Sequence, residues 1–239
     1  MTNLSKDNCY ESTLSLVKTF VESNQRKRIK LLTDIETKVD DLYLIGDKLF
    51  IEFDKDGDDW ALGWILQVIK KYKPEFFKDE KYNNWFNTYS KAEINYDELQ
   101  LRLLEQNFED ADRLTSSYLR KLAGKLAEKR GYVFYSEVNN MSEIDLQTID
   151  RLWSIYSNGK FGFSIQAKIL KSVGKKYELL WPKIGWKIDG CWTRYPKSFI
   201  WSLDAPEGHM PLINQLRGVR LMDSILRHPG ISSRHNNIL

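Results

Sequence analysis

The stretch from Asp145 to Gly174 constrains the fold most, because it predicts two helices joined by a corner too short to bury its own aromatic rings. Apolar residues recur at three- and four-residue steps between Leu146 and Tyr156, which is typical of one face of a helix. Asn158-Gly159 supplies the left-handed residue that commonly ends a helix, and Ser164 is the expected N-cap of the next one. We therefore expect this helix pair to nucleate a helical core.

The corner between the two helices is Phe161-Gly162-Phe163, two large rings on either side of a residue without a side chain. One interpretation is that both rings anchor the corner in the core. The other is that at least one ring lines a cavity for a flat apolar ligand. The residues themselves leave both interpretations open.

The composition excludes several classes of site. With 239 residues, of which 42% are hydrophobic, the chain suits one large folded domain or two small ones. Cys9 and Cys191 lie far apart, which favours a reducing compartment without a disulfide framework or a thiolate metal site. The three histidines lack metal-ligand spacing, and His209 is expected to form loop hydrogen bonds. Because no phosphate-binding loop or nucleophile elbow is present, we predict neither a metal centre nor an enzyme.

Basic and aromatic residues are concentrated in the second part of the chain. Residues 1–90 carry two more acidic than basic side chains, whereas the remainder carries five more basic than acidic ones. This asymmetry favours an anionic partner for the aromatic part. Nucleic acid is not expected, since no dense Lys/Arg run or known nucleic-acid module is present. No apolar run approaches the roughly 20 residues that span a bilayer, and no signal or transit peptide pattern is visible.

The first part of the chain predicts several helices. Residues 10–38 have the spacing of one or two helices, and the acids before Trp60 are expected to cap a helix over residues 60–72. The alternation from Leu49 to Phe53 fits a short strand or a helix end. Within residues 75–92, apolar spacing at 82, 85 or 86, and 89 fits a helix, which a connection near residues 90–95 follows. We place a domain boundary near residue 92, before a helical hairpin over residues 96–128.

The last third of the chain combines aromatic loops with paired arginines. Residues 181–196 place three indoles and a tyrosine in Gly- and Pro-rich sequence, and residues 199–203 alternate as a short strand or extended stretch would. Arg217 and Arg220 lie three residues apart and share a face if this segment is helical. They form either surface salt bridges or an anchor for carboxylates at the rim of an apolar cleft. We expect a frayed tail from residue 232.

Several motifs, in this order along the chain, resemble the Genomes Uncoupled Four family. They are Asp112 with Thr115 (ADRLT), DLQTIDRLWSIY from Asp145, SNGKFGFSIQ from Ser157, Gly185-Trp186, and APEGHMP from Ala205. The resemblance covers roughly residues 96–229. Residues 1–90 resemble, more loosely, the helical bundle that precedes the core in the cyanobacterial branch of the family.

The resemblance implies an all-α fold, with an N-terminal helical bundle (residues 1–92), a hand-like helical porphyrin-binding core with long loops (93–231) and the tail (232–239). It implies a non-catalytic regulator without an obligatory cofactor, which binds protoporphyrin IX or magnesium protoporphyrin IX and stimulates magnesium chelatase through its large H subunit. It also implies a plastid that makes the protein itself, or the cytoplasm of a cyanobacterium. We expect a monomer without a transmembrane segment, and we leave peripheral membrane association open.

The family's Asn-x-x-Arg-x-x-Arg pattern matches residues 214–220, and the resemblance places porphyrin propionates there. The porphyrin-binding residues that it implies are Phe161, Phe163, Trp192, Tyr195, Asn214, Arg217 and Arg220. The alternative function is a helical interaction scaffold of tetratricopeptide-like type without a ligand, which would use the hairpin over residues 96–128 as its docking face.

Overall fold

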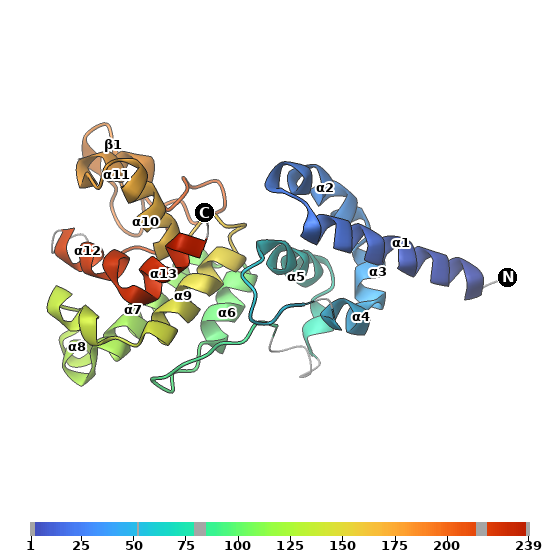
Figure 1. The fold of residues 1–239 in the computed structure, drawn as a ribbon, viewed down its shortest axis with the longest axis horizontal. Coiled ribbons are helices and arrows are strands. Elements are labelled where there is room, and N and C mark those ends of the chain that lie inside the picture. The colour runs from blue at the N-terminus through green and yellow to red at the C-terminus, as the bar shows by residue number, and fades with distance from the viewer. Residues whose placement is uncertain (1–2, 52, 79–84, 214–218, 238–239) are drawn as a thin grey trace. The chain divides into compact units, whose positions relative to one another are not determined.

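The computed structural model describes residues 3–51, 53–78, 85–213 and 219–237. The chain divides into two compact units, residues 1–87 and 88–239. Both units are built from helices, and within the described ranges the only sheet is a two-stranded hairpin (Figure 1), so the predicted all-α class is confirmed. None of the helices in these ranges is long and apolar enough to cross a membrane.

The first unit packs its helices around the apolar helix α5. Phe20 of α1 packs against Trp60 and Trp64, with ring centroids 6.0 and 5.5 Å apart. Asp59 caps α5 as the sequence predicts, because its carboxylate accepts a hydrogen bond from the Ala61 amide at 2.9 Å. The described elements of this unit are α1 (Asn3–Glu22), α2 (Gln25–Thr37), α3 (Val39–Leu44), α4 (Gly46–Ile51), α5 (Trp60–Tyr72) and the 3-10 helix η1 (Pro74–Lys78).

Two segments of the first unit differ from the simplest interpretation of their sequence. Residues 46–51 form the helix α4 rather than a strand, and Phe50 stacks on Trp85 with a centroid separation of 4.8 Å. The helix predicted from the spacing of residues 82–89 is wrong where the structure describes it, since residues 85–89 are irregular and only η1 before them is helical. Residues 79–84 lie outside the described ranges, and the expected connection near residues 90–95 is irregular as predicted. Phe50 and Trp85 instead stack on Phe76 in an aromatic cluster, so the spacing of these rings does not reflect a helix face.

The second unit begins with the predicted helical hairpin, α6 and α7, and surrounds the central helix α9. Figure 1 shows α13 lying against α9, with α10 and α12 beside them. Its described elements are α6 (Asp97–Leu104), α7 (Phe108–Ala123), α8 (Lys125–Arg130), the 3-10 helix η3 (Tyr135–Asn140), α9 (Glu143–Ile155), α10 (Phe163–Ser172), α11 (Tyr177–Lys183), β1 (Lys187–Ile188), β2 (Cys191–Trp192), α12 (Val219–Arg227) and α13 (Pro229–Asn237).

The corner between α9 and α10 is closed by Asp150, not by the predicted N-cap Ser164. Asp150 Oδ1 accepts a hydrogen bond from the Ser164 amide at 2.8 Å, and Oδ2 accepts one from Arg234 Nε at 2.8 Å. Gly162 stands at the helix start with φ of +132°, and a Cβ there would lie 2.8 Å from Asp150 Oδ1. Arg234 belongs to α13, which continues to Asn237 where the sequence predicts fraying.

The aromatic rings of the corner are core residues. Phe161 and Phe163 are fully buried, and the Phe161 ring meets Phe108 edge to face at 5.4 Å. Trp153 packs beside them and donates its indole N–H to Thr115 Oγ1 at 2.9 Å. Since Phe108 and Thr115 belong to α7, the corner fixes the position of that helix.

Asp145 attaches the segment before α6 to the centre of the unit. Its carboxylate accepts hydrogen bonds from the Ser90 hydroxyl, the Lys91 and Ala92 amides and the Tyr96 hydroxyl, at 2.5 to 3.2 Å. Burial alone would raise the Asp145 pKa, but these bonds and the nearby Ser142 hydroxyl outweigh it and hold the pKa below its usual range.

The aromatic sequence after α10 is partly regular. Trp181, expected in a loop, lies within α11 and stacks on Trp186 with a centroid separation of 5.6 Å. The β1–β2 hairpin follows, with Ile188 opposite Cys191. The expected strand over residues 199–203 is absent, because this described segment consists of turns and irregular backbone.

Candidate ligand-binding site

A cavity of about 910 Å³ lies between helix α7 and the loop that follows the β1–β2 hairpin. We call residues 192–201 the aromatic loop, because they contain Trp192, Tyr195, Phe199 and Trp201. The cavity lies at the upper end of the volume range, roughly 300–1,000 Å³, that is typical of ligand pockets. The described residues that line it are Asp112, Arg113, Ser116, Arg120, Trp192, Thr193, Arg194, Tyr195, Phe199 and Leu212.

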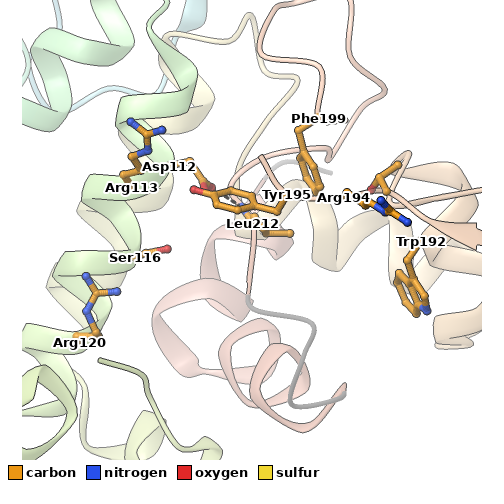
Figure 2. A pocket seen from close by; sticks show the side chains of 10 residues that line it. Asp112, Arg113, Ser116, Arg120, Trp192, Arg194, Tyr195, Phe199 and Leu212 are labelled. Carbon is orange, nitrogen blue, oxygen red and sulfur yellow. Dashed lines mark hydrogen bonds between the residues drawn. The ribbon is translucent and has the colours of Figure 1, made fainter. Parts of the chain in front are cut away.

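Helix α7 supplies a polar wall. Arg113, Ser116 and Arg120 lie along one face of the helix (Figure 2), and the opposite face packs into the core through Ala111, Thr115 and Tyr118. The two arginines are seven residues apart, which separates their Cα atoms by about 10 Å along the helix axis. Arg113 is already paired, with Glu109 at 2.5 Å and Asp110 at 3.2 Å.

Arg120 and Arg194 are different, because their guanidinium groups form no ion pair or hydrogen bond with any residue that the structure describes. Arg120 lies on α7 and Arg194 lies between Trp192 and Tyr195 in the aromatic loop. In Figure 2 they stand on opposite walls of the cavity. Two cations without partners beside an open cavity favour an anionic ligand, above all one with carboxylates that guanidinium groups bind in a bidentate manner.

The aromatic loop supplies the apolar wall. Trp192 and Tyr195 leave 49% and 45% of their surface exposed, so both rings are accessible to a ligand in the cavity. Phe199 is buried behind them, where it stacks on Trp201 at 5.5 Å and lies 4.8 Å from the His209 ring. The wall therefore combines accessible rings with a buried support.

His209 holds this support in place. Its Nε2 accepts a hydrogen bond from the Ile200 amide at 3.3 Å, so Nδ1 carries the proton and donates it to the Ile184 carbonyl at 2.7 Å. Burial lowers the His209 pKa, which keeps the ring neutral at physiological pH. The predicted role as a loop hydrogen-bonding residue is confirmed.

The segment that leads to Leu212 is attached to α10. The buried Gln166 side chain donates hydrogen bonds to the carbonyls of Gly208 at 3.0 Å and Pro211 at 2.8 Å. Two motifs singled out in the sequence, SNGKFGFSIQ and APEGHMP, therefore contact each other through this amide. Leu212, one residue further on, then faces the cavity.

Asp112 of α7 lies at the inner end of the cavity, 99% buried. Its Oδ1 accepts a hydrogen bond from the Leu212 amide at 2.6 Å, and its carboxylate also interacts with the Tyr195 hydroxyl. Figure 2 shows the Tyr195 ring extending from the aromatic loop toward this carboxylate. Burial raises the Asp112 pKa to about 7, although the Leu212 hydrogen bond, the nearby Tyr195 hydroxyl and the charge of Arg113 act in the opposite direction.

A smaller cavity of about 100 Å³ adjoins the first and shares Ser116, Arg120 and Leu212 with it. Its other walls are mostly apolar, among them Leu119, Val133, Ile213, Leu221 and Ile225. A ligand in the large cavity could thus place a small apolar substituent in this side pocket, next to the cation of Arg120.

The structure brings together only part of the residue set that the family resemblance implies. Trp192 and Tyr195 line the cavity. Phe161 and Phe163 lie in the core and are not among the described lining residues. Arg220 is exposed outside the described lining, with its guanidinium 5.5 Å from the ring of Tyr135 on η3. Asn214 and Arg217 lie outside the described residues.

The polar residues of the site were not identified from the sequence. Arg113 and Arg120 share a face of α7 through their seven-residue spacing, but solvated helices commonly show such spacing. Arg194 stands between two aromatic residues of a loop, which was the stronger signal. No group of three or more His, Cys, Asp or Glu residues within the described ranges is arranged to hold a metal ion.

Comparison with known proteins gives one family and several similar proteins. The model of the family described as GUN4-like matches residues 89–229. The Ycf53-like protein of the cyanobacterium Synechocystis sp. is 43% identical over 173 residues, 71% of this chain and 74% of that protein. The chloroplastic tetrapyrrole-binding protein of Arabidopsis thaliana is 39% identical over 151 residues, 59% of this chain and 57% of that protein.

Among solved structures, that of GUN4 from Chlamydomonas reinhardtii matches with a TM-score of 0.57 and 40% identity. The match covers 61% of this chain and 95% of that one. The matching proteins come from a cyanobacterium and from plastid-bearing organisms, in agreement with the predicted setting of a plastid or a cyanobacterium.

Proposed function

The chain belongs to the GUN4-like family, and on this premise we propose that it binds a porphyrin in the cavity between α7 and the aromatic loop. A porphyrin is a large, flat, apolar ring with carboxylates on its edge. A site for it needs aromatic surface for the ring and cations for the carboxylates. The name of the Arabidopsis relative, a tetrapyrrole-binding protein, supports the same class of ligand.

One observation supports this proposal most strongly. Two half-exposed rings, Trp192 and Tyr195, and the two guanidinium groups of Arg120 and Arg194 line the same cavity, and these cations have no partner within the described ranges. The cavity therefore offers, on the same walls, the accessible rings and the cations that a planar ring with two carboxylates would bind.

The assignment of individual residues is part of the proposal. Trp192 and Tyr195 contact the ring, while Arg120 and Arg194 bind the carboxylates. Phe161 and Phe163 act from the core, where Phe161 supports α7 through Phe108. For Asn214, Arg217 and Arg220, a role toward the propionates is supported by the family resemblance alone.

We further propose that the ligand is protoporphyrin IX or magnesium protoporphyrin IX and that the protein has no catalytic activity of its own. In this proposal it acts as a monomer that binds the large H subunit of magnesium chelatase and stimulates the enzyme. These finer statements rest on the family resemblance.

The test is a titration of the full-length protein with a soluble dicarboxylic porphyrin such as deuteroporphyrin. We expect saturable quenching of tryptophan fluorescence together with a shift of the porphyrin's Soret band. Trp192→Ala should weaken binding, whereas Trp64→Phe, in the core of the first unit, serves as the control for losing one indole. Addition of the H subunit and a magnesium chelatase assay with and without the protein then test the regulatory role.

The rival function is a ligand-free interaction scaffold that uses the α6–α7 hairpin. It predicts no Soret shift and no saturable quenching with any tetrapyrrole at micromolar concentration. That result would leave the fold and the family unaffected and would remove the porphyrin proposal.

A further inference from the structure

The ADRLT motif of α7 has a position in the structure that ligand contacts alone do not explain. Its threonine, Thr115, accepts the indole N–H of Trp153 at 2.9 Å and so belongs to the core. Its aspartate, Asp112, is instead buried at the inner end of the ligand cavity. A buried carboxylate without a cation partner is costly, because desolvation disfavours its charge. Asp112 forms no ion pair within the described residues.

The two groups that Asp112 binds come from the two ends of one segment. Leu212 donates its backbone N–H at 2.6 Å from a position 100 residues later in the chain. Tyr195 extends from the aromatic loop and brings its hydroxyl to the side of this carboxylate (Figure 2), where the charge of Arg113 also acts on it. One carboxylate thus connects both ends of residues 195–212 to α7, which forms the opposite wall of the cavity.

The Tyr195 end matters because of what is packed behind it. The Tyr195 ring meets Phe199 at 5.8 Å and Trp201 at 5.9 Å, both edge to face. Phe199 in turn lies against His209. Moving the Tyr195 hydroxyl away from α7 would therefore displace the whole aromatic wall and change the width of the cavity.

We propose that Asp112 is a positioning residue, which holds the aromatic loop at the distance from α7 that a planar ligand requires. This inference rests on the proposed function, since it concerns the same cavity. Asp112 acts through Tyr195 and Leu212 and does not itself bind the ring.

The charged and titratable groups around Asp112 determine how this contact responds to pH. Arg113 and Glu109 lie on its own helix, and Tyr195 is its titratable neighbour from the loop. The ionised carboxylate accepts hydrogen bonds more strongly than the protonated form. Affinity should therefore rise with pH through neutrality. His209 lies behind Phe199 rather than against Asp112, and burial lowers its pKa, away from neutrality.

The first test is a double-mutant cycle on porphyrin binding by the full-length protein, with deuteroporphyrin as the probe. Asp112→Asn keeps the shape and an acceptor for Leu212, while Tyr195→Phe keeps the ring and removes the hydroxyl. Each variant should raise the Kd about three- to tenfold. The Kd of the double variant should be no higher than that of the single variant that binds porphyrin more weakly. Asp112→Asn should also remove the pH dependence between pH 6 and 8. Asp189→Asn, on the exposed β1–β2 turn, is the matched control.

The second test needs no ligand. A nitroxide label on Lys197→Cys, with Cys9→Ser and Cys191→Ser, reports the mobility of the loop between Tyr195 and Phe199 by electron paramagnetic resonance. Asp112→Asn and Tyr195→Phe should each increase the label's mobility, and Asp189→Asn should not.

The outcomes separate this inference from the proposed function. If the wild-type protein binds porphyrin, but both variants bind equally well and leave the label unchanged, the positioning role is refuted and the porphyrin function stands. Additive losses in the cycle would also refute it, because they would show that Asp112 and Tyr195 act independently. If the wild-type protein binds no porphyrin while the label responds as expected, the contact is real and the proposed function fails.

Discussion

Replacing the buried Asp112 by Asn should change the stability of the protein in a pH-dependent way. Burial raises the pKa of Asp112 in the folded state to about 7, from an ordinary value of 3.8. A raised pKa means that folding is favoured while the carboxyl is protonated and loses that advantage as the pH rises through the folded-state pKa. From these two values, the wild-type protein should lose about 2.5 kcal/mol from this group between pH 5 and pH 8.

The asparagine side chain of the Asp112→Asn variant does not titrate, so the unfolding free energy of the variant should not decrease in this way between pH 5 and pH 8. The variant should be less stable than, or similar to, the wild type at pH 5, and it should gain relative to the wild type as the pH rises. All other titrating groups are common to both proteins and cancel in the difference. Asp189→Asn, which alters an exposed aspartate, should show no such trend.

The assay is urea denaturation of the full-length protein at half-unit pH steps, followed by tryptophan fluorescence. Five of the eight tryptophans lie in the second unit, so the signal reports mainly on the unit that contains Asp112. The difference in unfolding free energy between variant and wild type is then plotted against pH. A flat difference would show that Asp112 is ionised at pH 5, and it would refute the argument from burial.

Two further predictions concern the frame around the site. Gly162→Ala should destabilise the second unit by about 1–3 kcal/mol more than Gly174→Ala. Both positions have positive φ, but only at Gly162 would the new methyl group meet a carboxylate, that of Asp150 at 2.8 Å. Equal shifts of the thermal midpoint in the two variants would contradict this. Asp145→Asn should cost about 1.5–3 kcal/mol at neutral pH, since Asp145 accepts four hydrogen bonds. Because the Asp145 pKa is lowered in the folded state, this stabilisation is present above the ordinary pKa and is lost as the pH falls below it. The unfolding free energies of the wild type and Asp145→Asn should therefore converge in acid. A difference that persists in acid would count against an ionised Asp145.

The sequence predicted the elements whose pattern is local. The helices on either side of Gly162 follow from apolar spacing within about a dozen residues, and the cap at Asp59 follows from its place before an apolar run. The partner of Asp150, by contrast, is Arg234, 84 residues away. No local pattern marks such a pair, so the tail of the chain was expected to fray rather than to form α13.

The wrong secondary-structure predictions in the first unit have a related cause. Phe50, Phe76 and Trp85 have spacings that fit a strand or a helix locally, yet they stack on one another in a single aromatic cluster. Tertiary packing of large rings outweighs the weak preference of short segments. Alternation over five residues was too short to decide between α4 and a strand.

For the candidate site, composition located the aromatic half and missed the charged half. Trp192 and Tyr195 were identified because the family resemblance and the Gly- and Pro-rich context agreed. Arg120 could not be distinguished from a solvated helix residue without knowing that the aromatic loop faces α7. Asp112 was assigned to a motif, but its burial depends on Leu212 and Tyr195, which lie far away in the sequence.

The central claim is that the unpaired guanidinium groups of Arg120 and Arg194 bind the carboxylates of a porphyrin whose ring lies on the aromatic loop. The most direct measurement compares Kd values for deuteroporphyrin and for its dimethyl ester, in the wild type, in Arg120→Gln with Arg194→Gln, and in the control Arg26→Gln, an exposed position of the first unit. The double variant should bind the diacid at least about tenfold more weakly and the ester almost unchanged, while the control matches the wild type. Equal losses for diacid and ester, or no loss for either, would contradict the claim.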